Sequence, residues 1–188
     1  MLQLNIQNET SRLRAVILGT ARSNGPVPKV ADCYDPKSVQ HVVAGTYPKE
    51  EAMILEMEAV VKVFEKYNIQ VFRPDVIEDY NQIFSRDIAF VIEDKFIEAN
   101  ILPDRELEYK AIHHVISKIK PDNVIVLPEE CHVEGGDVMP WNEYIFVGMY
   151  SGVDYSDFIT ARTNTDAVIV LQELFPHKIV KSFELRKS

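Results

Sequence analysis

The sequence of 188 residues has little cysteine and no long apolar run, and both scarcities exclude classes of protein. Its two cysteines, Cys33 and Cys131, lie far apart, which leaves neither a disulfide framework nor the spacing of a zinc site. No apolar stretch approaches the ~18 residues of a membrane span, and the opening residues lack the basic-then-apolar order of a signal peptide. We therefore expect a cytoplasmic protein with reduced thiols and no membrane partner.

Basic residues are also scarce, with 20 Lys and Arg against 29 Asp and Glu and a formal net charge of -9. Proteins that follow nucleic-acid phosphates need clustered basic side chains, so no nucleic-acid partner is expected. An acidic chain suits a small cationic ligand better, although acidic balance also serves solubility alone. The length and the 46% hydrophobic content predict one globular domain over residues 1–188.

Apolar runs of two kinds predict an α/β (α+β) fold. Short runs bounded by turn residues predict strands at 14–19, 69–74, 88–92, 95–99, 123–128, 138–141, 144–148 and 178–185. Apolar residues at helical spacing predict helices at 48–67, at 105–120 after a cap at Asp104, and from a cap at Thr163 or Asn164 onward, whereas residues 20–47 predict a long loop. The helical side chains expected in the core are Met53, Met57, Val60, Val61, Phe64, Leu107, Ala111, Val115, Ile119, Val168, Leu171 and Leu174.

Two segments of the chain repeat one order of elements. The pairs Glu93-Asp94 and Asn142-Glu143 each separate two apolar runs and predict hairpin turns. With an offset of 137 minus 87, or 50, Asp87 aligns with Asp137 and Glu93 with Glu143, and a helix and a strand follow each hairpin. We interpret these segments as ββαβ units, which stack or close into a ring because none buries its apolar face alone.

The most unusual stretch is His132-Val133-Glu134-Gly135-Gly136-Asp137. Paired glycines in a strand context remove side chains where another backbone or a ligand must come close, and acids then flank a cleared space. The alternative is a turn or bulge in which Asp137 only receives hydrogen bonds from nearby backbone. Spacing alone leaves both interpretations open.

A second motif lies upstream, and the two together resemble a known family. Asn81-x-x-Phe84-Ser85-Arg86-Asp87 resembles the Asn-x-x-Phe-x-Arg-Asp signature of the guanidine-modifying (pentein) superfamily, which includes arginine deiminase, dimethylarginine dimethylaminohydrolase and glycine amidinotransferase. Glu134-Gly135-Gly136-Asp137 resembles its Glu-Gly-Gly-Asp element. Similarity to the glycine amidinotransferase branch continues through the segments 47–49, 71–75, 96–99 and 162–164. The resemblance implies an α/β-propeller of five ββαβ units, of which about three are present in this chain.

The resemblance also implies covalent chemistry on a small cationic guanidino substrate such as arginine. In that family a cysteine thiolate attacks the guanidinium carbon, and the resulting amidino-thioether passes to water in hydrolases or to an amine in transferases. A planar cation with a fork of N–H donors is best held by two carboxylates. No metal or organic cofactor is implied.

Five residues take roles from the family's motifs. Glu134 matches the catalytic carboxylate that pairs with the guanidinium and orients the histidine, and Asp87 matches the second carboxylate of the clamp. Arg162 matches a position that holds the substrate's carboxylate, although an arginine at a helix entry fits it equally well. Asn81 and Phe84 are substrate-binding positions of the upstream motif.

The chain departs from the family's pattern at its nucleophile. The catalytic histidine and cysteine of the family follow the third and the fifth unit, and neither is expected before Ser188. Cys131 and His132 are poor substitutes, because neighbouring residues of a strand face opposite ways. The sequence is therefore expected to be the N-terminal portion of a longer enzyme, inactive alone, or a catalytically incomplete guanidine-binding or scaffold protein. The sequence does not distinguish a transferase from a hydrolase, and it leaves open whether the protein forms a homodimer.

Overall fold

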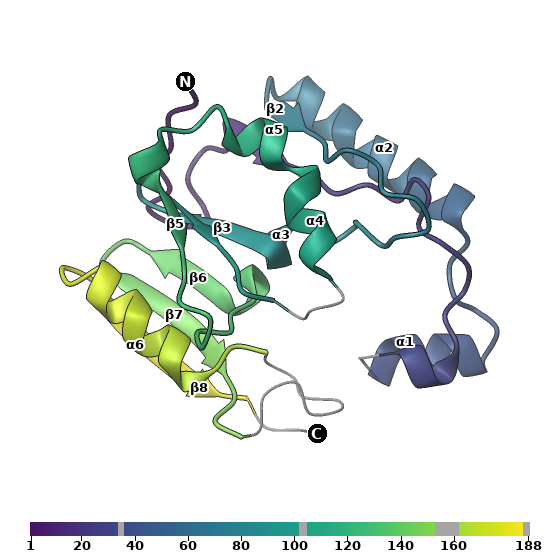
Figure 1. Cartoon of the computed structure of the whole chain (residues 1–188). Helices are drawn as coiled ribbons and strands as arrows, with labels where there is room; N and C mark the ends of the chain where they lie inside the picture. Colours follow the sequence, from purple (N-terminus) through teal and green to yellow (C-terminus); the bar gives the residue numbers. More distant parts are fainter. Residues whose placement is uncertain (34–35, 102–104, 153–161, 186–188) are drawn as a thin grey trace. The chain divides into compact units, whose positions relative to one another are not determined.

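The computed structural model of the chain describes residues 1–33, 36–101, 105–152 and 162–185 (Figure 1). They form two compact units. The small unit is Leu13–Ser85, and the large unit combines Met1–Arg12 with Arg86–Ser188. None of the helices among the described residues has the length and apolar composition that crossing a membrane requires.

The small unit is built on two short parallel strands and one long helix. Strand β1 (Ala15–Ile17) pairs with β2 (Gln70–Phe72), and α2 (Glu50–Lys66) connects them and packs against β2. The acidic first turn of α2 lies at the positive end of the helix dipole. Its Glu50 carboxylate also accepts hydrogen bonds from the backbone N–H groups of Ser23 and Asn24, both at 3.1 Å. One side chain thus ties the segment after β1 to the start of α2.

Two predictions for the small unit are wrong. The expected loop at 20–47 contains the 3-10 helix η1 (Val30–Asp32) and the helix α1 (Pro36–Val43), whose proline stands at the first helical position, where a missing N–H costs nothing. Helix α2 forms as predicted, but no residue in it is fully buried. Val60, expected in the core, is 40% exposed, and Met53, Met57, Val61 and Phe64 are half-buried.

The large unit contains two three-stranded sheets with the same strand order. In the first, β3 (Ala89–Ile92) runs antiparallel to β4 (Lys95–Glu98), which pairs in parallel with β5 (Val124–Val126). In the second, β6 (Val138–Trp141) runs antiparallel to β7 (Tyr144–Met149), which pairs in parallel with β8 (Ile179–Glu184). The predicted mixed α/β character and the repeated strand order of these two segments are therefore confirmed.

The hairpin turns fix how the two sheets correspond. Glu93 and Asn142 are the first residues of two-residue turns and have φ of 55° and 53°, as hairpins with the twist of the flanking strands require. The offset between them is 142 minus 93, or 49, so Glu93 corresponds to Asn142, and its predicted alignment with Glu143 is wrong. Because side chains alternate along a strand, an error of one residue exchanges the two faces of the sheet.

Helices follow the hairpin in each of the two repeats of the large unit. The predicted helix 105–120 is two helices, α4 (Glu106–Ala111) and α5 (His113–Ile116), because the helix is interrupted at Ile112. Leu107, expected inside, is 44% exposed, and Glu108 is buried instead. The expected cap Asp104 lies outside the described residues. The predicted burial of Ala111, Val115 and Ile119 is confirmed.

The helix α6 (Thr165–Leu174) packs along β7 and β8 (Figure 1). Its predicted cap is confirmed, since Asn164 Oδ1 accepts a hydrogen bond from the backbone N–H of Ala167 at 3.0 Å. Leu171 is buried as predicted, Leu174 is 37% exposed, and Val168 is half-buried. The remaining short elements are α3 (Ser85–Ile88), η3 (Pro121–Asn123) and η4 (Gly135–Asp137). The core of the large unit includes Ile88, Ile92, Ile97, Ile112, Val115, Val133, Val138, Ile145, Val147 and Leu171.

Candidate functional site

The two sequence motifs meet at the starts of corresponding strands. Asp87 lies in α3, which runs directly into β3, and Glu134 precedes η4, which runs directly into β6. The side chain of Asp87 is 19% exposed and that of Glu134 is 8% exposed. The fold therefore brings two carboxylates from separate repeats to one partly dry region.

The paired glycines make this approach feasible. A Cβ atom on Gly135 would overlap the carbonyl oxygen of Arg86, and one on Gly136 would lie 2.8 Å from Asp87 Oδ1. The interpretation that the glycines clear space for another backbone is thus confirmed, and the segment that approaches is the upstream motif itself.

Arg86 fastens the two motifs together. Its Nε donates to the carbonyl oxygen of Gly135 at 3.0 Å, and its Nη2 donates to the carbonyl oxygen of Val138 at 2.8 Å. Its Nη2 also donates to Glu9 Oε1 at 2.9 Å, and Nη1 to Glu9 Oε2 at 3.3 Å. Arg86 thus connects α3, η4 and the N-terminal segment, which fixes the backbone that presents Asp87 and Glu134.

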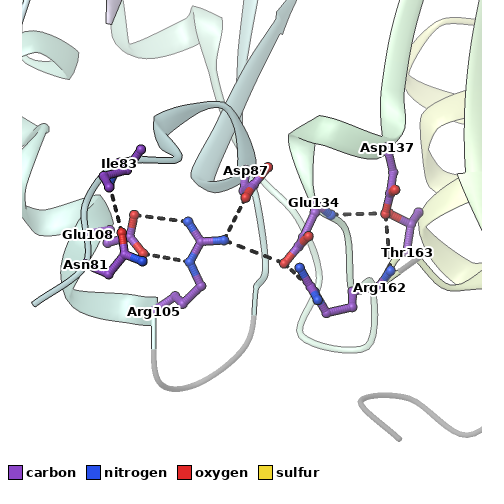
Figure 2. Close-up of polar contacts among 9 residues, drawn as sticks. All are labelled: Asn81, Ile83, Asp87, Arg105, Glu108, Glu134, Asp137, Arg162 and Thr163. Carbon is purple, nitrogen blue, oxygen red and sulfur yellow. Dashed lines mark hydrogen bonds and ion pairs between the residues drawn. The ribbon is translucent and has the colours of Figure 1, made fainter. Parts of the chain in front are cut away.

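A guanidinium of the chain itself lies between the carboxylates (Figure 2). Arg105 Nη1 donates to Asp87 Oδ2 at 2.8 Å and lies 3.7 Å from Glu134 Oε1. On its other side, Arg105 Nε donates to Glu108 Oε1 at 2.6 Å, and Nη2 donates to Glu108 Oε2 at 3.1 Å. Three carboxylates therefore surround one guanidinium.

The charges of this cluster are strongly coupled. Burial tends to lower the pKa of Arg105, but the hydrogen bonds and negative charges of Glu108 and Asp87 outweigh it, so the pKa is raised and Arg105 stays cationic. Burial is also the largest influence on Glu108 and raises its pKa, with the charges of Asp87 and Glu134 adding to the rise and Arg105 opposing it. Arg105 thus opposes the rise in the pKa of Glu108 that burial and the neighbouring acids cause.

Arg162 and Thr163 complete the other side of Glu134. Arg162 Nε donates to Glu134 Oε1 at 2.7 Å, and the backbone N–H of Glu134 donates to Thr163 Oγ1 at 3.2 Å. The hydroxyl of Thr163 donates to Asp137 Oδ2 at 2.8 Å, and the backbone N–H of Arg162 donates to the same oxygen at 3.2 Å. Asp137 thus accepts hydrogen bonds from the segment that enters α6, namely from Arg162 and Thr163.

Two members of the cluster, Arg105 and Glu108, were not predicted from the sequence. A visible pattern could have revealed Glu108, because it shares a helical face with Ala111 and Val115 at spacings of three and seven residues. Nothing in the sequence marks Arg105 beyond its spacing of three from Glu108. Within the described residues, no group of three or more His, Cys, Asp and Glu side chains is arranged to hold a metal ion.

The remaining predicted site residues belong to the small unit. Asn81 Oδ1 accepts a hydrogen bond from the backbone N–H of Ile83 at 3.1 Å, and Phe84 is 59% exposed. The cluster in the large unit therefore joins Asp87, Glu134 and Arg162, and the roles of Asn81 and Phe84 stay predictions.

Solved structures with the same fold include two amidinotransferases and a dimethylarginine dimethylaminohydrolase. An amidinotransferase of the saxitoxin biosynthetic pathway from Microseira wollei has a TM-score of 0.72 and 16% identity, covering 96% of this chain and 62% of that one. Inosamine-phosphate amidinotransferase from Streptomyces griseus has a TM-score of 0.68 and 15% identity, covering 95% and 62%. Dimethylarginine dimethylaminohydrolase from Pseudomonas aeruginosa, in complex with citrulline, has a TM-score of 0.65 and 16% identity, covering 94% and 62%.

The chain has the fold of the pentein superfamily. No protein-family model matches its sequence, and no curated protein does so at a significant level. The chain spans 62% of the length of the three pentein structures named above. Identities this low show the pentein fold alone, so the chemistry of the chain must be argued from its own residues.

Proposed function

We propose that the chain is the substrate-clamping part of a pentein enzyme that acts on arginine or a related guanidino compound. The observation that carries the proposal is that Asp87 and Glu134 already face one guanidinium, that of Arg105, at 2.8 and 3.7 Å. Oxygen atoms placed to hold the guanidinium of an arginine side chain can hold that of a free guanidino compound by the same bonds. The excess of carboxylates in the cluster favours such a cation.

In this proposal each residue of the cluster has a defined task. Asp87 and Glu134 accept N–H donors from opposite sides of the substrate's guanidinium, and Glu134 also orients the proton-transferring histidine. Arg162, whose side chain is 22% exposed, turns from Glu134 to the substrate's carboxylate. The guanidinium then lies between two fixed negative charges with its carbon open to attack.

The covalent step is proposed for the full-length protein. A cysteine thiolate attacks the guanidinium carbon, the departing amine takes a proton from a histidine, and the amidino group stays on sulfur until water or an amine accepts it and releases the thiolate. Cys131 is unsuited to this step, because it is 1% exposed and burial, with the charges of nearby acids such as Glu130, raises its pKa. The nucleophile and the base are therefore proposed to come from sequence outside these 188 residues.

The test is a product and adduct assay on full-length protein. Arginine is supplied alone and with an amine acceptor, the products are separated, and acid-quenched protein is weighed by mass spectrometry. We expect consumption of the guanidino compound and an amidino adduct on one cysteine. If arginine and its N-methylated forms are left intact and no adduct forms, the enzymatic proposal is wrong.

A non-catalytic guanidine-binding or scaffold protein is the second candidate. It is favoured by the engagement of Asp87, Glu108 and Glu134 with arginines of the chain itself, which is what a purely structural ion-pair network would show. Calorimetric titration of the full-length protein with arginine, run beside the product assay, distinguishes the two. Binding without turnover supports the second candidate, and turnover eliminates it.

A further inference from the structure

Arg105 is held at one end by a buried carboxylate and at the other by a less buried one. Two of its nitrogens form the bidentate pairing with Glu108 that holds a guanidinium most firmly, and the Glu108 side chain is only 3% exposed. The third nitrogen, Nη1, reaches Asp87, whose side chain is 19% exposed. Breaking the buried pair is costly, so the bond to Asp87 is the one that an incoming ligand can replace.

The Nη1 end of Arg105 occupies acceptors that a ligand guanidinium needs. Nη1 of Arg105 bonds Asp87 Oδ2 and faces Glu134 Oε1, so a second guanidinium that binds these oxygens competes with that nitrogen. Resting on the proposed function, we propose that Arg105 is a specificity-determining residue, an internal competitor that a ligand guanidinium displaces from Asp87. Glu108 is the residue that positions this competitor.

Competition of this kind selects against small guanidinium ions. Such an ion gains hydrogen bonds to Asp87 and Glu134, but it must break the charged hydrogen bond from Arg105 Nη1 to Asp87 in a partly buried place. The exchange of one charge-assisted bond for another yields little net binding. A ligand is retained only if it makes further contacts beyond its guanidinium, so Arg105 makes the clamp discriminate by the rest of the molecule.

The test measures how the full-length protein binds methylguanidinium chloride by titration calorimetry, with tetramethylammonium chloride as the salt control. In Arg105→Gln we expect binding about 10- to 100-fold tighter than in the natural chain, since one or more charged hydrogen bonds of competition are gone. Arg105→Lys keeps the positive charge but loses the planar set of N–H donors. Its affinity for methylguanidinium should fall between those of Arg105→Gln and the natural chain. Arg73→Gln is the matched control, because it removes a guanidinium paired with Glu58 at 3.6 Å in the small unit and should change nothing.

A double variant separates competition from the refilling of a hole. If methylguanidinium merely takes the place of Arg105 against Glu108, then Arg105→Gln combined with Glu108→Gln loses the tighter binding, and the proposal is overturned. The proposal requires the double variant to stay tighter than the natural chain, because Asp87 and Glu134 are intact in it.

The binding results distinguish a failure of the competitor role of Arg105 from a failure of the proposed function. Binding by the natural chain with no gain in the Gln and Lys variants overturns the competitor role and leaves the proposed function standing. An absence of binding in the natural chain and in all of the variants overturns both. Circular dichroism checks the fold of each variant, and the Lys variant carries the test if the Gln variant does not fold.

Discussion

Gly135 and Arg86 approach so closely that a Cβ atom on the glycine would overlap the carbonyl oxygen of the arginine. The same Cβ would also lie 3.1 Å from the carbonyl oxygen of Ala89, so backbone surrounds the position. Backbone atoms cannot rotate away as a side chain can. The contact between the two motifs therefore depends on the absence of a side chain at this residue.

We predict that Gly135→Ala lowers the free energy of unfolding by about 3 kcal/mol or more, as overpacking against fixed atoms does. Gly136→Ala is the matched comparison, because its Cβ would meet only the end of the Asp87 side chain, which can move. That variant should cost about 1 kcal/mol or less and weaken guanidinium binding instead. Urea unfolding of both variants checks the order, and equal losses would contradict it.

Glu134→Gln should reduce turnover of the guanidino substrate by about 100-fold or more in the full-length protein, since an amide keeps the shape and loses the charge that faces the cation. Glu130→Gln, four residues upstream and exposed, is the control and should turn over normally. Steady-state measurement of kcat/KM with arginine compares the two variants with the natural protein. Unchanged kcat/KM in Glu134→Gln would remove this residue from the mechanism.

Asp137 should make stability depend on pH in a recognisable direction. Burial and the charge of Glu134 raise its pKa from 3.8 to about 6, against the hydrogen bond from Thr163. The folded protein holds this proton more tightly than the unfolded chain does, so the natural protein loses stability relative to Asp137→Asn as pH rises from about 4 through about 6.

We expect this relative loss to be on the order of 1–2 kcal/mol, after allowing for partial exposure. It is measured by urea unfolding of both proteins at several pH values. A difference between them that stays constant from pH 4 to pH 7 would show that Asp137 has an ordinary pKa in the folded state.

The first hairpin turn is linked to the segment before β8 by a buried cation. Lys178 Nζ lies 3.0 Å from Glu93 Oε1 and donates to the carbonyl oxygen of Asn142 at 2.5 Å, and its side chain is 3% exposed. His177 Nε2 lies 3.0 Å from the same Glu93 oxygen. Glu93 thus joins the two sheets of the large unit through one carboxylate.

Glu93→Gln should therefore lower the free energy of unfolding by about 2 kcal/mol, because the Lys178 ammonium loses its counter-charge in a buried place. Burial tends to raise the pKa of Glu93, but the donors His177 and Lys178 lower it overall. This stabilisation is present above the ordinary Glu pKa of 4.5 and is lost as pH falls through the lower folded value. Asp94→Asn, at an exposed neighbour, is the control and should cost little by thermal unfolding.

Local sequence patterns were sufficient to predict structure where the conformation of a segment depends on its own few residues. Both hairpins, the cap at Asn164 and the burial of Val115 could be predicted, because turn residues, side-chain caps and helical spacing act over a few residues. Helix α1 could not, because Pro36 and Gly45 lie near its ends and indicate a loop as readily as a helix. The single-domain organisation and the number of repeats stay predictions.

The sequence alone was enough to place the motifs of Asp87 and Glu134 at the starts of two separate repeats, because strand and turn patterns are local, but it left open whether the glycines clear space or form a turn. Only the tertiary structure decided which charges pair there. Arg105 lies between Asp87 and Glu108, and Glu108 is buried whereas Leu107 is 44% exposed. Ion pairing depends on which distant side chains share a dry place, and no local pattern of residues encodes that.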